Sequence, residues 1–196
     1  MRYLLGLIVA FLLTSSQAIR PTGPALFIGD SITKNWDVAK VLPEAVNAGQ
    51  AGEGIHQMHK RTIPQMQTLR PGLVHILAGT NDPLDSKARR TIGKVLAVAF
   101  AAREAGANMV VIGTIPPIEP GRYTLRPPDV RRYNAFLKIL AILCGFKVVD
   151  YHAAMSGPSG QFRPELFADG IHPNAQGYKV MQQTLDDALD IKAPLY

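Results

Sequence analysis

Short, continuous apolar runs alternate with longer amphipathic stretches along this chain, and the alternation limits the folds it can adopt. The expected strands are the runs rich in Val, Ile and Leu at residues 25–28, around Val46, and at 73–77, 109–112 and 147–149. The expected helices lie between and after them, at residues 56–69, 87–105, 129–144 and 175–191. Because the apolar runs are unbroken, we expect strands buried on both faces. The pattern predicts an α/β fold in which helices cover both faces of a parallel five-stranded sheet.

The chain divides into a short N-terminal segment and one domain. Residues 1–18 have the layout of a secretory signal peptide, with Arg2 at the start, an apolar run at 4–13, and a small-x-small ending at Ala18. That run is about half the length that a membrane-spanning helix needs. We therefore expect cleavage after Ala18 and a single domain at 19–196, secreted or periplasmic, without stable membrane insertion. An uncleaved membrane anchor is the alternative.

Cysteine content and charge restrict the other classes of protein. Cys144 is the only cysteine, so no intramolecular disulfide can form, and we expect it to be a small buried apolar residue. The formal net charge is +6, with basic residues scattered along the chain. Because no aromatic residues interleave with them as a stacking platform, a nucleic-acid partner is not expected.

Four segments with polar or glycine residues follow expected strands, directly or through one loop. They are Gly29-Asp30-Ser31, residues 49–54, Gly79-Thr80-Asn81-Asp82, and Asp169-Gly170-Ile171-His172. In an open parallel sheet, sites form outside the carboxyl ends of the strands. We therefore expect the four segments to converge on one edge of the sheet.

These segments contain the groups that a serine hydrolase needs. Ser31 is the candidate nucleophile, and the spacing of Asp169 and His172 lets the carboxylate orient the imidazole as a base. The side chain of Asn81 and the backbone N–H of Gly52 are candidate donors to an oxyanion. Taken singly, each residue has an ordinary alternative as a helix cap or turn residue. Their occurrence together at strand ends favours the catalytic interpretation.

The same segments resemble the sequence blocks of the SGNH/GDSL hydrolases. Gly29-Asp30-Ser31-Ile32 is similar to the first block, with Ile32 in place of leucine, and residues 47–52 to the second. Gly79-Thr80-Asn81-Asp82 and Asp169-Gly170-Ile171-His172 are similar to the third and fifth blocks. The resemblance implies a flavodoxin-like three-layer α/β/α fold and ester hydrolysis without a metal or cofactor. It also implies an oxyanion hole formed by the N–H groups of Ser31 and Gly52 and the side chain of Asn81.

The substrate is less constrained than the chemistry. The first block and the absence of a long lid insertion favour short acyl groups, acetyl especially, on a carbohydrate or similar alcohol. Trp36 is a candidate for lining the pocket, with core packing as the alternative, and Arg122 and Arg126 are candidates for contacting an anionic substrate. A lysophospholipase or thioesterase, an acyl transferase, and a non-catalytic glycan- or envelope-binding protein remain alternatives. His56 and His59 lack the spacing of a helical zinc pair, so no metal site is expected.

Overall fold

The computed structural model describes residues 21–190, so the predicted signal peptide lies outside the described residues. The strands are β1 (Ala25–Gly29), β2 (Val46–Gly49), β3 (Leu73–Leu77), β4 (Met109–Gly113) and β5 (Lys147–Val149). They form a parallel sheet with the order β2-β1-β3-β4-β5. The sheet confirms the predicted α/β fold, and each expected strand is present.

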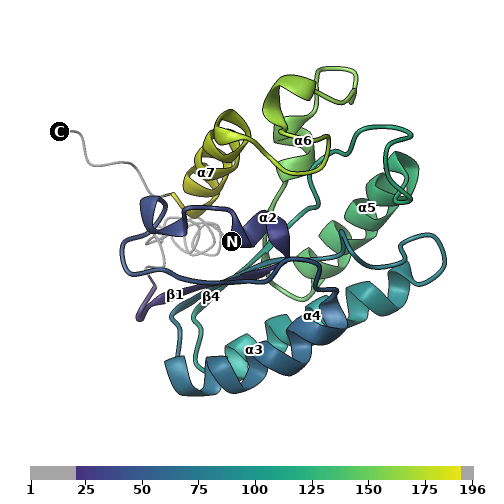
Figure 1. Ribbon diagram of the computed structural model, residues 1–196. Helices are drawn as coiled ribbons and strands as arrows, with labels where there is room; N and C mark the ends of the chain where they lie inside the picture. The colour runs from purple at the N-terminus through teal and green to yellow at the C-terminus, as the bar shows by residue number, and fades with distance from the viewer. Residues whose placement is uncertain (1–20, 191–196) are drawn as a thin grey trace, which may run out of the picture.

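Helices cover both faces of this sheet (Figure 1). On one face pack α3 (Ile55–Leu69), α4 (Ala88–Glu104) and α5 (Pro127–Leu143), with Leu26 and Ile28 of β1 in the same core. On the other face lie α7 (Ala175–Leu189) and the short α6 (Tyr151–Met155), with Phe27 in that core. Successive strand residues therefore point into two separate cores, which explains why the strands are apolar without alternation.

The sequence pattern did not indicate the shortest elements. These are α2 (Ser31–Lys34), α6 and the 3₁₀ turns η1 (Val38–Lys40) and η2 (Pro164–Leu166). Elements of three to five residues are too short to show a helical period. The prediction of a buried Cys144 was also wrong, because this residue ends α5 as its C-cap and is only partly buried against the core.

His75 lies in the centre of β3 and is completely buried. Its Nε2 is 2.8 Å from the hydroxyl oxygen of Tyr151, and its ring stacks on Phe27 with the centroids 5.0 Å apart. These contacts make His75 a hydrogen-bonded core histidine. Because burial penalises the charged imidazole, the pKa of His75 is lowered to about 3.

The buried His75 should make folding stability depend on pH. The unfolded chain takes up a proton below about pH 6.5, whereas the folded protein does not, so stability falls as pH falls through this range. We expect the free energy of unfolding in urea to drop by up to about 1.4 kcal/mol per pH unit between about pH 6 and 4 from this residue. The His75→Phe variant should be less stable at pH 7 but show a shallower slope. An unchanged slope would contradict this assignment.

Candidate functional site

The turn that carries Ser31 is held from four directions. The carboxylate of the buried Asp30 accepts the Ile32 N–H at 2.9 Å and so caps α2. The Asn47 side chain donates to the carbonyls of Thr33 and Trp36 at 2.8 and 2.9 Å. The Tyr178 hydroxyl of α7 donates to the Ile32 carbonyl at 2.8 Å. The fourth contact is the backbone of Gly49, which lies directly against Lys34. The position of the serine is therefore fixed by the strands β1 and β2 and by α7.

Ser31, His172 and Asp169 form one continuous hydrogen-bonded chain. Ser31 Oγ is 2.8 Å from His172 Nε2, and His172 Nδ1 is 2.7 Å from Asp169 Oδ2. A carboxylate can only accept, so Nδ1 carries the proton and Nε2 accepts from the serine hydroxyl. Desolvation acts to raise the pKa of Asp169, but hydrogen bonds from the His172 backbone and side chain and from the Ile171 backbone hold it below its ordinary value. An ionised Asp169 is the state that orients the imidazole as a proton acceptor.

The loop that carries Asp169 and His172 is fixed by its own backbone and by the segment after β4. Asp169 Oδ1 accepts the N–H groups of Ile171 and His172 at 3.1 and 2.9 Å. The Tyr123 hydroxyl donates to the Asp169 carbonyl at 2.6 Å, and the Glu119 N–H donates to the Gly170 carbonyl at 2.8 Å. Gly170 has φ +87°, and a Cβ there would collide with the Glu119 side chain. The segment 114–126 therefore packs directly against this loop.

Asn81 and Gly52 lie beside each other at the same edge of the sheet. The Asn81 side-chain amide donates at 3.1 Å to the carbonyl of Glu53, which is the residue that follows Gly52. Gly52 is exposed and has φ +77°, a conformation that favours glycine. Arg61 of α3 holds this loop through three hydrogen bonds to the Glu53 carboxylate, at 3.0, 3.2 and 2.6 Å, and one to the Ala48 carbonyl at 2.8 Å.

Asp82, next to Asn81, has a structural contact. Its Oδ2 accepts the Ile55 N–H at 3.0 Å, at the first residue of α3. Burial raises the pKa of Asp82, and the hydrogen bond from Ile55 opposes this shift. The contact ties the loop after β3 to the start of α3, so Asp82 supports the loop that carries Asn81.

A groove of about 530 Å³ leads away from Asn81 between the loop after β3 and the segment 114–126. Tyr123, Arg126 and Ile171 are among its lining residues. Arg126 also pairs with the buried Asp129 at 2.7 Å. Arg122 instead pairs with Glu119 at 2.9 Å and is not among the residues that line the groove. The two candidate arginines thus differ in their relation to the groove.

Trp36 lies in the core and not in the groove. Its side chain is 3% exposed and makes ring contacts with Phe27, His75, Tyr151 and Tyr178 at centroid distances of 5.6 to 6.2 Å. Trp36 is therefore a core residue and does not line the pocket.

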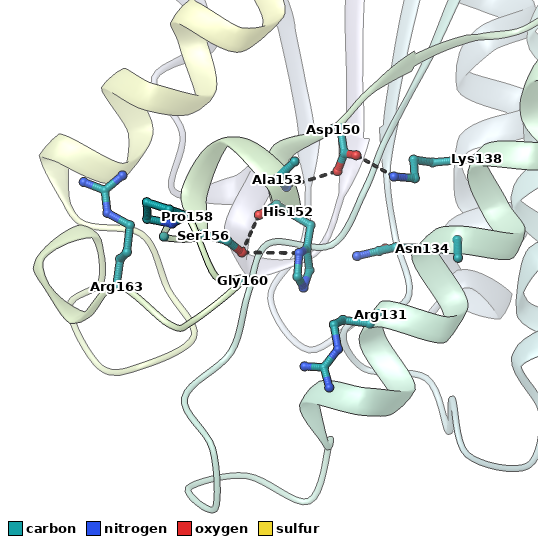
Figure 2. Close-up of a pocket in the computed structure, with 12 residues that line it drawn as sticks. Arg131, Asn134, Lys138, Asp150, His152, Ala153, Ser156, Pro158, Gly160 and Arg163 are labelled. Carbon is teal, nitrogen blue, oxygen red and sulfur yellow. Dashed lines mark hydrogen bonds and ion pairs between the residues drawn. The ribbon is translucent and has the colours of Figure 1, made fainter.

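A second cleft, of about 750 Å³, lies between α5 and α6 (Figure 2). His152 and Arg131 point into it, and Lys138 forms an ion pair with Asp150 at 2.6 Å on its wall. None of Ser31, Asp169 and His172 lines this cleft. Within residues 21–190, no group of three or more His, Cys, Asp and Glu side chains is arranged to hold a metal ion.

The sequence interpretation missed the residues that hold the site in place. Tyr123, Tyr178 and Arg61 act on partners that are 46, 146 and 8 positions away along the chain. A single tyrosine or arginine in a helix or loop carries no local pattern that identifies such a partner. The Asn47 contacts belong to the same group, although this residue is within the second block that resembles the SGNH/GDSL hydrolases.

Structural comparison finds this fold in known hydrolases. A GDSL-like lipase from Bacteroides thetaiotaomicron is 24% identical, with 94% of this chain and 96% of that chain covered and a TM-score of 0.76. An acetylxylan esterase from Geobacillus stearothermophilus is 18% identical, with 90% of this chain and 98% of that chain covered and a TM-score of 0.72. At these identities the likeness shows the fold alone.

Sequence comparison identifies the family. No match to the chain was found among curated protein sequences. The model of the GDSL-like lipase/acylhydrolase family, however, matches residues 27–180, a range that includes all four predicted site segments. The match confirms the resemblance to GDSL hydrolases stated from the motifs. The chain belongs to the GDSL-like lipase/acylhydrolase family.

Proposed function

We propose that the protein is a serine esterase in which Ser31 is the nucleophile, His172 the base and Asp169 the residue that orients the base. The observation that carries this proposal is the unbroken chain of two hydrogen bonds from Ser31 Oγ to Asp169 Oδ2, at 2.8 and 2.7 Å. All three side chains are partly exposed, so an ester can reach the serine. Membership of the acylhydrolase family supports the same chemistry.

The proposed reaction has two steps. Ser31 Oγ forms a bond to the ester carbonyl carbon while His172 Nε2 takes the hydroxyl proton, and the carbonyl oxygen becomes an oxyanion. The tetrahedral intermediate collapses, and the alcohol leaves with the proton from His172. Water then attacks the acyl-enzyme with His172 again as the base, which releases the acid and restores Ser31.

The oxyanion is expected to bind to the N–H groups of Ser31 and Gly52 and to the Asn81 amide. Asn81 now donates to the Glu53 carbonyl, and this bond holds its amide at the mouth of the site, next to the Gly52 loop. Donors that are fixed before the reaction stabilise developing charge without reorganisation. The ion pair of Arg61 with Glu53 supports this role, because it restrains the loop on which Gly52 lies.

We propose short acyl groups, acetyl especially, on a carbohydrate or similar alcohol as the substrate. Structural likeness to an acetylxylan esterase, at 18% identity, is in keeping with this choice. The groove beside Asn81 supports it further, because hydroxyl, amide and charged side chains line it together with Leu84 and Ile171. Such a mixed lining suits a polar alcohol better than a long acyl chain. We also propose that the protein is exported, on the basis of residues 1–18.

The test is hydrolysis of nitrophenyl acetate by the purified protein and by its Ser31→Ala variant. We expect clear turnover by the wild type and a loss of at least about 10⁴-fold in kcat in the variant. A series of nitrophenyl esters then separates the substrate classes: a maximum at acetyl supports the proposal, and a maximum beyond about octanoyl indicates a lysophospholipase or thioesterase. Activity that survives in Ser31→Ala would refute the assignment of the nucleophile.

The position of Arg126 in the groove leads to a prediction about charge selectivity. We expect Arg126→Ala to raise KM for an anionic ester about two- to fivefold, which corresponds to the binding free energy of an exposed ion pair. KM for a neutral ester should stay unchanged. Arg122→Ala is the matched control, because it removes the same charge outside the groove. Equal changes for the two variants, or for the two esters, would contradict a contact between Arg126 and substrate.

A further inference from the structure

One helix face is strongly apolar and yet exposed to solvent. The exposed fractions are 54% for Phe136, 57% for Ile139, 40% for Leu140, 64% for Ile142 and 77% for Leu143. All five belong to the last eight residues of α5. Phe100 of α4 is 43% exposed, and its ring packs on Phe146, three residues beyond the end of α5, with the centroids 5.0 Å apart. We call these six residues, Phe100 and the five of α5, the α5 apolar face.

This face is unusual for a protein surface in water. Single exposed apolar side chains are common, but a contiguous group of large ones marks a surface that binds a partner or a membrane. The opposite side of α5 is already buried in the core through Val130, Tyr133, Leu137 and Ala141. The α5 apolar face is therefore not needed for packing within the described part of the chain.

The charges around the face are positive. Between Val130 and Lys147 the sequence contains four cations, Arg131, Arg132, Lys138 and Lys147, and no Asp or Glu. Lys138 pairs with Asp150 at 2.6 Å and Arg132 lies 3.8 Å from Asp129, which leaves Arg131 and Lys147 without an ion pair within the described residues. At the other end, Arg103 lies over the Phe146 ring at 4.0 Å and donates to the Cys144 carbonyl at 3.0 Å. The exposed last residue of α4, Glu104, adds one negative charge there. An apolar strip bordered by cations matches the boundary of a membrane with anionic lipids.

The location of the face in the fold supports the same occupant. Because α5 returns from the carboxyl end of β4 to the start of β5, its last turns lie near the amino edge of the sheet, away from Ser31. The chain enters the described domain at that same edge: the Thr22 N–H contacts Asn108 Oδ1 at 3.4 Å, just before β4. A membrane at the α5 apolar face would leave the proposed catalytic edge free to meet soluble or wall-bound esters.

A second copy of the chain is a less suitable occupant of the α5 apolar face, because of the charges around that face. In a two-fold dimer the same surface of each copy would meet the other. Residues 130–147 contain four cations and no anion. Lys138 and Arg132 lie against acidic side chains outside this range, but Arg131 and Lys147 form no ion pair within the described residues, so self-docking would bring like charges together. We propose that the α5 apolar face docks peripherally on membrane surfaces that contain anionic lipid.

The test is co-sedimentation with phosphatidylcholine vesicles, with and without phosphatidylglycerol. We expect binding to the anionic vesicles and a fall of about tenfold or more in the partition coefficient in the variant Ile139→Gln/Leu143→Gln, which changes no charge. Any contribution of residues outside the described domain is common to both proteins. The control variant Gln57→Glu/Gln67→Glu adds two negative charges on exposed positions of α3. It should still bind much more strongly than Ile139→Gln/Leu143→Gln.

Each outcome decides the proposal without reference to esterase activity. Loss of binding in the variant Ile139→Gln/Leu143→Gln, with an unchanged thermal unfolding midpoint, supports the proposal. Equal binding by wild type and variant, or no binding to either vesicle, overturns it. The proposal is also overturned if sedimentation equilibrium shows a dimer for the wild type and a monomer for Ile139→Gln/Leu143→Gln. A second copy of the chain would then be the occupant of the face.

Discussion

Changing Asp169 to asparagine is expected to lower kcat for nitrophenyl acetate by about 10⁴-fold with little effect on the fold. The reason is the geometry of the carboxylate. Its Oδ1 accepts the N–H groups of Ile171 and His172, so an amide at this position would keep its oxygen there. The amide NH₂ would then take the place of Oδ2, which is 2.7 Å from His172 Nδ1.

A donor opposite Nδ1 forces the wrong tautomer on His172. Nδ1 would lose its proton and Nε2 would carry one, so Nε2 could no longer accept the proton of Ser31. Because the defect concerns proton transfer and not binding, kcat and kcat/KM should fall together. The matched control is Asp187→Asn, which removes the same charge from an exposed position of α7 and should keep wild-type activity. An Asp169→Asn variant with more than about a tenth of wild-type activity would show that this carboxylate is not the orienting group.

The strands and the position of the site could be predicted from the sequence because both depend on local patterns. A strand buried on two faces needs an unbroken run of apolar residues, such as 73–77, and each of the five expected runs became a strand. Parallel pairing then brings Ser31, Asn81 and His172 to one edge without further information. The contact of His172 with Ser31 spans 141 positions, but it follows from the topology once the strands are placed.

Other features depend on contacts that the sequence does not encode locally. Trp36 could have lined the pocket or the core, and its packing against Tyr178 of α7 is what decides between them. The Tyr123 hydroxyl reaches the Asp169 carbonyl from a proline-rich loop that has no regular pattern. The exposure of Leu143 was also unpredictable, since an apolar stretch reads equally as core or as surface until its neighbours are known.

A substitution of Gly49 by alanine should both destabilise the protein and disrupt the site. Gly49 ends β2, and the added Cβ would meet the backbone nitrogen of Lys34 well inside van der Waals contact and lie 2.7 Å from the Lys34 Cα. Backbone atoms of a capped helix cannot turn aside as a flexible side chain can, so α2 would have to move. Overpacking costs about 1–3 kcal/mol where side chains can adjust, and we expect about 3 kcal/mol or more here. The midpoint of thermal unfolding should fall by roughly 6–12 °C for a domain of this size.

The control is the same change in a place without close neighbours. Gly93 lies in the middle of α4 and is exposed, and a Cβ there would have no atom within 4 Å beyond the backbone of its own helix. Gly93→Ala should therefore stabilise the protein by up to about 1 kcal/mol through helix propensity. Because α2 carries Ser31, the Gly49→Ala protein that remains folded should also lose esterase activity as the 2.8 Å bond to His172 is broken. A Gly49→Ala variant that unfolds at the wild-type temperature with full activity would show that α2 adjusts to the added methyl group, and that β2 does not fix the position of the nucleophile.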